Sequence, residues 1–240
     1  MTLLESRVAS VPMDDPGFKL QIRASGDFMG WRSHAVKKEP WTLQWLAQIP
    51  PDGVLYDVGA CVGSYSLMAA ARGVKVVAIE PVPLNYAECV ANVRLNNLSR
   101  RITVLNCAAG LSTTPITLFT KLTPGYGLAS ERRRTHEQVQ VVVPVRRLDD
   151  IAAQYGAPTH IKVDVEGAER EVISGARDIL DTVTSVICEI RDDYNEKWVV
   201  RRMRGRGLES VWNGGRRTEE ERTHVFERVN RKDTVISVGG

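Results

Sequence analysis

Short apolar runs alternate with helical patterns along most of the chain. Each run is long enough for a buried strand. The stretch after it places apolar residues three and four positions apart, which predicts a helix packed against a sheet. Strands separated by helices in this way are typical of a doubly wound α/β fold with a mostly parallel sheet. The predicted strands lie at 54–58, 74–79, 102–106, 161–165 and 184–190, and the predicted helices at 65–72, 84–97, 147–153, 168–180 and 194–206.

The βα pattern is interrupted between residues 111 and 145. Two strand-like segments, 115–120 and 138–143, flank a polar, basic stretch that contains glycine. This arrangement predicts an antiparallel hairpin insertion with a mobile loop, and long loops in compact domains are often functional. We expect residues 122–134 to form a flap that orders over a bound substrate.

The two ends of the chain flank this core. Residues 1–50 are predicted to form an N-terminal extension that covers the ligand crevice or packs on its rim, and residues 51–240 form the main domain. Within the extension, the alternation at 18–22 predicts a strand, residues 27–34 a loop, and the apolar positions after Pro40 a helix. Further candidate strands at the sheet edge are 207–212, 223–229 and 234–238.

Composition and charge restrict the function only slightly. The 240 residues suit one α/β domain with an attached segment, and a net charge of +3 does not by itself indicate a nucleic-acid partner. A polar stripe on the helix at 84–97, formed by Asn85, Asn92 and Asn96, is interpreted as a solvated face. Clusters of arginine are interpreted first as solvated surface and second as a patch for an anionic substrate. They lie at 132–134, 201–206 and 216–217.

The cysteines and the N-terminus bear on localisation. Cys61, Cys89, Cys107 and Cys188 lack a metal-binding spacing, and we interpret them as reduced and mostly buried. The first residues lack the apolar stretch of a signal peptide, and no run approaches the roughly 18 apolar residues of a membrane span. We therefore expect a cytoplasmic protein without a membrane span. The sequence leaves the oligomeric state open, and a homodimer is compatible with it.

A glycine-bearing turn follows the first strand of the main domain. The strand ends at Asp57-Val58-Gly59-Ala60-Cys61-Val62-Gly63, and a helix begins directly after it. Two glycines let the backbone turn sharply and let a ligand approach the amides at the helix start. The G-x-x-x-G spacing differs from the G-x-G-x-x-G of dinucleotide sites. Either the glycines only shape the turn, or the turn binds a different nucleoside.

Two carboxylates favour the second interpretation. Asp57 would repel a pyrophosphate but attract the cationic amino-acid end of S-adenosylmethionine. Glu80 ends the next strand, about 20 residues after the turn, where an acidic side chain can accept hydrogen bonds from ribose hydroxyls. Small residues at 107–110 could let an adenine lie on the backbone, although a plain loop explains them nearly as well. The candidate donor-binding residues are Asp57, Gly59, Ala60, Gly63, Tyr65, Glu80, Asn106 and Ala108.

A second acidic motif ends the strand at 161–165. His160, Lys162 and Asp164 alternate, so their side chains share one face. Asp164 lies at the carboxyl end, where open α/β sheets place their sites. A lysine on a central strand needs a partner or a function, because a buried unpaired charge is costly. Glu166 and Glu169 follow, and we interpret Glu169 as an acid favoured near a helix N-terminus.

This motif suits transfer of a methyl group to an alcohol, which needs a base for the hydroxyl proton or a cation for the alkoxide. Asp164 is the candidate base, and Lys162 either tunes its charge or anchors the substrate. Glu189, near the end of the neighbouring strand, is the third catalytic candidate. Alternatively, Glu189 and Asp192 or Asp193 could join Asp164 around Mg²⁺. A metal is the weaker option, so no metal ligand is assigned.

Several of these segments resemble the FkbM family of methyltransferases. The resemblance runs from about residue 39 to residue 190, and its last segment is the most specific. It implies a class I, Rossmann-like fold with a seven-stranded sheet, and S-adenosylmethionine-dependent O-methylation, typically of sugar, glycan or polyketide hydroxyls. Cys61 departs from the family, in which asparagine is more usual, and this puts one turn-stabilising hydrogen bond in doubt. The segments are Glu39-Pro40-Trp41-Thr42 with Trp45, residues 57–66, Glu80-Pro81 and Ile161-Lys162-Val163-Asp164-Val165-Glu166-Gly167-Ala168-Glu169.

The favoured function is O-methylation of a hydroxyl on a small molecule, sugar or glycan. The first alternative is an RNA or other nucleic-acid methyltransferase, which the arginine clusters fit. Against it, no Asn-Pro-Pro-type motif follows a strand, and no aromatic-rich basic surface is evident. The second alternative is a catalytically inactive S-adenosylmethionine-binding protein, against which Asp57, Glu80 and Asp164 argue. The expected partner is a hydroxylated small-molecule or glycan acceptor.

Overall fold

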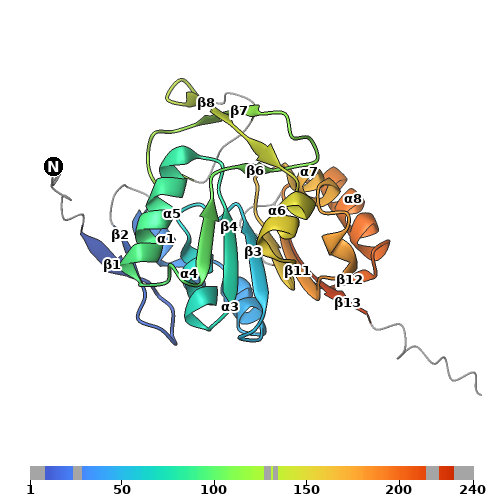
Figure 1. Cartoon of the computed structure of the whole chain (residues 1–240), viewed down its shortest axis with the longest axis horizontal. Helices are drawn as coiled ribbons and strands as arrows, with labels where there is room; N and C mark the ends of the chain where they lie inside the picture. The colour runs from blue at the N-terminus through green and yellow to red at the C-terminus, as the bar shows by residue number, and fades with distance from the viewer. Residues whose placement is uncertain (1–8, 24–28, 127–130, 132–134, 215–221, 230–240) are drawn as a thin grey trace, which may run out of the picture.

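A computed structural model of the chain describes residues 9–23, 29–126, 131, 135–214 and 222–229 (Figure 1). Its core is a seven-stranded sheet, in which five neighbouring strands are parallel to one another. The two strands at the other edge run antiparallel to their neighbours. This confirms the predicted doubly wound sheet. The order is β12 (Leu208–Gly214), β13 (Arg222–Arg228), β11 (Ser185–Ile190), β10 (His160–Val163), β3 (Val54–Val58), β4 (Lys75–Ile79) and β5 (Ile102–Leu105).

Helices cover both faces of this sheet. On one face, α3 (Pro40–Leu46), α4 (Ser64–Ala71) and α5 (Pro83–Leu95) pack against the strands. On the other face lie α6 (Leu148–Tyr155), α7 (Glu169–Ser174) and α8 (Asp193–Arg204). Side chains on each strand alternate between the two faces, so each face has its own apolar cluster. The helix predicted at 168–180 is shorter, because it ends at Gly175, where a Cβ atom would overlap the carbonyl oxygen of Gly110.

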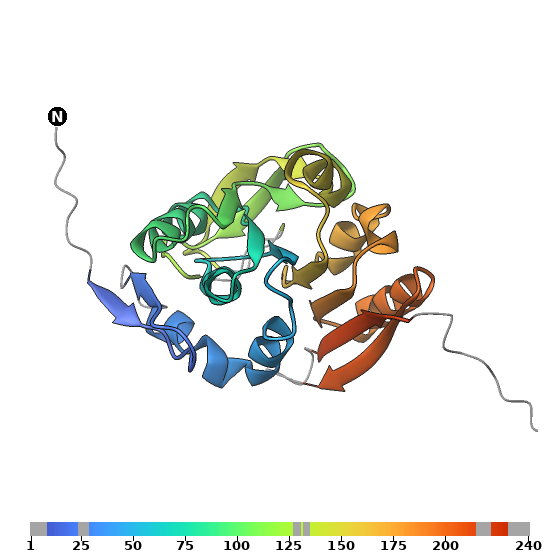
Figure 2. The same cartoon turned by 60° about the horizontal axis from the view of Figure 1, so that its bottom comes forward.

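The N-terminal segment packs against the sheet-bearing core rather than standing apart from it (Figure 2). The strand predicted at 18–22 is β2 (Gln21–Arg23), which pairs with β1 (Ser10–Pro12). The loop predicted at 27–34 is wrong over its described part, because α1 (Met29–Ser33) and α2 (Ala35–Lys38) lie there. Tertiary contacts stabilise these two short helices: Asp14 accepts hydrogen bonds from the amides of Val36 and Lys37.

Asn85 and Asn92 in the asparagine stripe of α5 are buried and Asn96 is partly buried, so the interpretation of the stripe as a solvated face is wrong. Asn92 and Asn96 accept from the amides of Arg23 and Gln21 in β2 at 2.9 Å, and the Asn92 amide also donates to Val62 in the glycine turn. Amide side chains can donate and accept at once, which suits them to satisfying a strand edge. Sequence polarity alone does not distinguish this use from exposure to water.

The hairpin insertion is present as predicted. Its strands are β7 (Ile116–Thr120) and β8 (Val139–Val143), which pair antiparallel. In Figure 1 the hairpin stands beyond the upper ends of the central strands. The segment at 107–110 is not a plain loop, because β6 (Ala108–Ala109) pairs with β9 (Val145–Arg146). The candidate strand at 234–238 lies outside the described residues, as does most of the predicted flap.

No helix among the described residues is long and apolar enough to cross a bilayer. The cysteines are free thiols, as predicted: Cys61 is partly buried, and Cys89, Cys107 and Cys188 are buried.

Candidate active site

The glycine turn is packed against two other parts of the chain. Gly59 and Gly63 have φ values of +86° and +88°, which favour glycine. A Cβ atom on Gly59 would overlap the carbonyl oxygen of Asp164, and one on Gly63 would lie 2.7 Å from Sγ of Cys89. The close approach that requires Gly59 is therefore to the end of β10. This contact brings the two predicted motifs together.

Glu80 closes the turn from the end of β4. Its Oε2 accepts from the amide of Cys61 at 2.8 Å and its Oε1 from the amide of Val82 at 2.9 Å. Burial raises the pKa of Glu80 to about 7, and the two amides oppose that rise only in part. Cys61 has a φ of +52°, a left-handed conformation that asparagine adopts more readily. The amide of Cys61 nevertheless keeps its hydrogen bond to Glu80.

Asp57 lies beneath the turn and is fully buried. Its Oδ2 accepts from the hydroxyl of Ser66 at 2.6 Å, and Nζ of Lys162 lies 3.8 Å from its Oδ1. Burial raises the pKa of Asp57, and the positive charge of Lys162 opposes this shift. In this structure Asp57 supplies negative charge to the turn without presenting a surface to the crevice.

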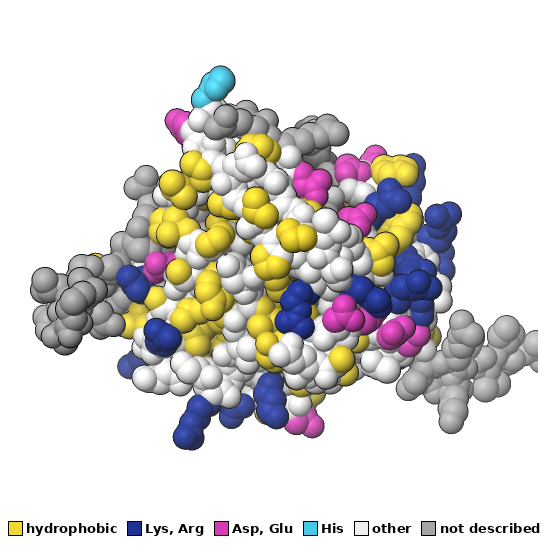
Figure 3. All heavy atoms as spheres, turned by 45° about the horizontal axis from the view of Figure 1, so that its top comes forward, with side chains coloured by type: hydrophobic (Ala, Val, Ile, Leu, Met, Phe, Trp, Pro, Cys, Tyr) yellow, Lys and Arg dark blue, Asp and Glu magenta, His cyan; other side chains and the backbone are white. Residues whose placement is uncertain are grey.

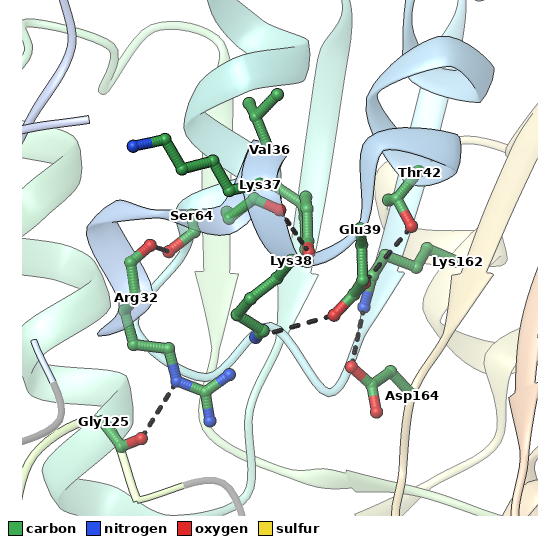
Figure 4. Close-up of polar contacts among 12 residues, drawn as sticks. Arg32, Val36, Lys37, Lys38, Glu39, Thr42, Ser64, Gly125, Lys162 and Asp164 are labelled. Carbon is green, nitrogen blue, oxygen red and sulfur yellow. Dashed lines mark hydrogen bonds and ion pairs between the residues drawn. The ribbon is translucent and has the colours of Figure 1, made fainter. Parts of the chain in front are cut away.

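Lys162 is the centre of the site (Figure 4). Its Nζ donates to Oδ2 of Asp164 at 3.2 Å, and the ammonium lies 4.9 Å from the centre of the Tyr65 ring. Burial lowers the pKa of this lysine, but attraction to carboxylates outweighs burial and raises it well above the usual value. The ammonium is therefore charged at every physiological pH. The four carboxylates are those of Asp164, Asp57, Glu39 and Glu189.

A small pocket opens beside Lys162 at the carboxyl end of β10. Glu39, immediately before α3, places its carboxylate here, where Oε2 accepts from the hydroxyl of Thr42 at 3.2 Å and Oε1 lies 3.6 Å from Nζ of Lys38. The sequence analysis assigns no role to Glu39, and the one available signal is its position directly before the proline that begins a helix. The pocket is lined by Glu39, Thr42, Lys162, Val163, Asp164, Ile187, Glu189 and Thr223.

The three catalytic candidates come together in this pocket, but His160 does not. Lys162, Asp164 and Glu189 line it from adjacent strands. His160 lies at the other end of β10, against the ring of Trp45, and burial lowers its pKa to about 4. Its imidazole is therefore neutral near pH 7. His160 supports the packing of α3 rather than the chemistry.

Other predicted donor-binding residues surround the turn. Asn106 donates from its side chain to the carbonyls of Glu80 and Pro81 at 2.9 and 3.0 Å, so it shapes the backbone after β4. Ala60 is buried, and Tyr65 donates to the carbonyl of Ala35 at 3.4 Å. Ala108 packs with Leu118, Val143 and Val145 beneath the hairpin, so its side chain is part of a core cluster.

The start of the predicted flap is held from two sides. Gly125 donates its amide to Oδ1 of Asn85 and accepts from Nε of Arg32, both at 3.0 Å (Figure 4). Tyr126 accepts from the Asn85 amide at 3.0 Å. Arg32 comes from α1, which also contacts the glycine turn through a hydrogen bond between its carbonyl and the Ser64 hydroxyl. The N-terminal segment therefore joins the start of the predicted flap to the turn, and ordering of the flap over a bound substrate stays a prediction.

The loop after β10 holds a second buried acid. Glu169 accepts from the amide of Gly167 at 2.7 Å, is fully buried, and has its pKa raised to about 7 by burial. Glu169 lies in the first turn of α7, at the helix N-terminus as predicted, and burial in addition favours its neutral form. Glu166, with a φ of +60°, forms an ion pair with Arg191 across the same edge. Both interactions fix the loop that follows Asp164.

The carboxylates considered for Mg²⁺ are engaged elsewhere. Asp192 caps α8 by accepting from the amide of Asn195 at 2.8 Å, and Asp193 lies 3.3 Å from Arg222. Across the part of the chain that the structure describes, no group of three or more His, Cys, Asp or Glu side chains is arranged to hold a metal ion.

Comparison with known proteins identifies related sequences. The sequence model of the methyltransferase FkbM domain matches residues 57–226. Methyltransferase sdnD of Sordaria araneosa is 30% identical over 163 residues, which are 54% of this chain and 62% of that protein. The 31-O-demethyl-FK506 methyltransferase FkbM of Streptomyces tacrolimicus is 29% identical over 198 residues, which are 68% of this chain and 75% of that protein. The chain thus spans less than two thirds of the first relative and three quarters of the second.

Solved structures show the same fold. The crystal structure of Streptococcus pneumoniae Sp1610 in complex with S-adenosyl-L-methionine aligns with a TM-score of 0.52. The alignment covers 81% of this chain and 74% of that one, at 15% sequence identity. At this identity the likeness shows the fold alone. The Rossmann-like architecture is therefore confirmed by both the sheet order and the comparison.

Proposed function

This chain belongs to the FkbM family of methyltransferases, and we propose that it transfers a methyl group from S-adenosylmethionine to a hydroxyl of a small molecule, sugar or glycan. The observation that carries the proposal is the position of Asp164. It follows β10 directly, lies against the glycine turn at Gly59, and is paired with Lys162. A carboxylate here can reach a hydroxyl presented at the carboxyl edge of the sheet.

The residues around the turn fit an S-adenosylmethionine site in charge and position. When bound, S-adenosylmethionine supplies an electrophilic methyl group on a positively charged sulfur. Asp57, Glu80 and Asp164 place three carboxyl groups around the turn, and their ionised forms would attract such a cation. Glu80 would accept hydrogen bonds from ribose hydroxyls, with the turn at 59–63 beside it. Within the chain its two oxygens already accept from the amides of Cys61 and Val82, which fixes the orientation of the carboxylate.

Asp164 would take the proton from the acceptor hydroxyl. Attack by a neutral alcohol is slow, and a positioned base removes the proton as the oxygen becomes a nucleophile. Lys162 keeps Asp164 ionised through the 3.2 Å ion pair. Lys162 itself cannot be the base, because its raised pKa leaves no free amine. Glu189, on the next strand, would help to position the acceptor.

The pocket beside Asp164 favours a polar acceptor. Carboxylates and threonine hydroxyls dominate its lining, and Val163 and Ile187 add a smaller apolar part. Such groups can accept from and donate to several hydroxyls at once. The pocket itself has room for only about one water molecule, so its lining supports a polar acceptor hydroxyl at this edge and does not set the size of the acceptor. The relative named as a 31-O-demethyl-FK506 methyltransferase supports transfer to oxygen.

The direct test is Asp164→Asn, which keeps the size of the side chain and removes its charge. We expect kcat to fall about 10²–10⁴-fold, while affinity for S-adenosylhomocysteine changes only a few-fold. Transfer from labelled S-adenosylmethionine would be measured across a panel of sugars and hydroxylated metabolites. Asp193→Asn is the matched control, since Asp193 lies at the same edge and is exposed.

Two results would contradict this role. Normal turnover by folded Asp164→Asn would leave Asp164 as a structural residue. Loss of wild-type activity in EDTA, restored by Mg²⁺, would make it a metal ligand instead of a base.

A further inference from the structure

The outer side of α8 carries a stripe of aromatic and basic residues that the methyl-transfer site does not use. Residues three and four positions apart lie on one side of a helix, and here they line a surface pocket. The opposite side of α8 is apolar and buried through Val199 and Met203. The pocket is lined by Trp198, Arg201, Arg202, Gly205 and Arg206.

Two aromatic rings extend this stripe toward the active-site edge. The guanidinium of Arg170, from α7, lies 4.9 Å from the centre of the Tyr194 ring and 5.1 Å from that of Trp198. Cations at this distance are attracted by the electron-rich ring face. Arg170 therefore holds both rings in place and adds a positive charge of its own. We call Arg170, Tyr194, Trp198, Arg201, Arg202 and Arg206 the α8 stripe.

The charges of the stripe are poorly balanced within the chain. Among the described residues, Arg201 and Arg202 have no acidic partner at ion-pair distance, and Nε of Arg202 is buried without a hydrogen-bond partner. Arg206 is paired with Asp181 at 2.7 Å. Figure 3 shows Lys and Arg side chains gathered on the right of the molecule, with Asp and Glu side chains among them, where α7 and α8 lie in Figure 1. Unpaired guanidinium groups beside an indole suit carboxylate or sulfate groups carried on sugar rings.

The stripe also starts at the edge that holds the active site. Glu189 lines the catalytic pocket, and α8 begins only four residues later, at Asp193. Twelve helical residues then lead away from this edge over roughly 18 Å. The pocket lies on the α3 side of the sheet and α8 covers the other side, so a chain whose terminal unit reached Asp164 would cross the carboxyl edge of the sheet before it continued along this length. We propose that the α8 stripe binds an acidic polysaccharide chain, an inference that rests on the proposed transfer to a sugar or glycan hydroxyl.

An acidic saccharide fits the stripe better than RNA does. Arg170 stacks on both of its aromatic rings, which leaves less ring surface for the base stacking that single-stranded RNA uses. The remaining groups are guanidiniums, which recognise the anionic groups of a chain. The stripe is thus organised for charged substituents.

The test uses the full chain and heparin as the probe, with neutral dextran as the uncharged comparison. Binding would be followed by calorimetry and by the fluorescence of Trp198, identified with Trp198→Phe. We expect heparin to bind, dextran not to bind, and affinity to fall as salt rises. The double substitution Arg201→Gln with Arg202→Gln should weaken heparin binding at least about tenfold.

Arg204→Gln is the matched control, because Arg204 lies on the same helix but is paired with Glu209 at 3.1 Å. It should leave heparin affinity within about twofold. Equal weakening by this control, no binding of heparin at low salt, or tighter binding of a transfer RNA than of heparin would each overturn the proposal. Asp164→Asn should bind heparin normally, so loss of methyl transfer and loss of polysaccharide binding are separate results.

Discussion

The two faces of the central strands differ sharply. On the side that faces α6 to α8, the side chains of β3, β10 and β11 are apolar, as at Val58, Ile161 and Val186. Tyr56 also lies on this side, and its hydroxyl donates to the carbonyl of Gly156. Facing α3 and α4, the same three strands carry polar and charged groups beside Leu55 and Ile187. These groups are Asp57, His160, Lys162, Ser185 and Glu189. One backbone thus supports an apolar layer on one side and a charged layer on the other.

This difference separates stability from chemistry. Apolar burial on the α6–α8 face contributes favourable free energy in proportion to its area. Burial of the charges around Lys162 opposes folding unless each charge keeps its partner. The cluster lies at the carboxyl end of β10, where we propose that the methyl transfer takes place. The N-terminal segment completes the charged layer by adding Glu39 and the Trp45 hydrogen bond to Ser185, 2.8 Å long.

Removing the positive charge of Lys162 should have the largest effect on the stability of the protein. In Lys162→Met the carboxylates of Asp57 and Asp164 lose their buried partner, so we expect the free energy of unfolding to fall by about 3–5 kcal/mol. Urea denaturation measures this change. Lys75→Met, at an exposed position of β4, should have almost no effect. Adding Asp57→Asn should recover part of the loss, and a strictly additive double variant would show that the pair is not coupled.

The second prediction concerns the pH dependence of donor binding on the charged face. If ribose hydroxyls donate to ionised Glu80, binding must release the proton that Glu80 holds below its pKa of about 7. Affinity for S-adenosylhomocysteine should therefore rise with pH, by at most about tenfold per unit below pH 7, and level off above it. Calorimetry from pH 5.5 to 8.5 tests this.

Glu169→Gln serves as the control for that titration, because burial also raises the pKa of Glu169 to about 7 but Glu169 is the first residue of α7, away from Glu80. It should keep the pH dependence of binding, whereas Glu80→Gln should flatten it. If Glu169→Gln flattened the profile and Glu80→Gln did not, the ribose-binding role of Glu80 would be wrong.

A change on the apolar face should have the smallest effect. Ile161→Val removes one buried methylene. Ile161 is next to Lys162 in the chain, but its side chain lies on the opposite side of β10. We expect a loss of about 0.5–1.5 kcal/mol in unfolding free energy and an unchanged methyl-transfer rate per folded molecule. Thermal denaturation and single-turnover transfer give the two values. A large drop in rate would show that the two faces are not independent.

The sequence by itself determined the strands, the sheet class and the two acidic motifs. The segments at 54–58 and 161–165 are short and rich in β-branched residues, which favours strands, and the alternation of Lys162 and Asp164 already predicts a shared face. Each of these inferences depends on neighbours within a few residues, and local periodicity carries that information.

Tertiary structure alone decided which distant groups meet. Glu39 reaches Lys162 because α3 packs on β10 and β11, and Asn92 satisfies the edge of β2 from 69 residues away. The φ of Gly59 is required by the carbonyl of Asp164, which lies more than one hundred residues later in the chain. In the sequence a polar residue looks the same whether its side chain forms hydrogen bonds with water or with a distant part of the backbone. Only the packing of the chain selects between these two partners, because both meet the same hydrogen-bonding requirement.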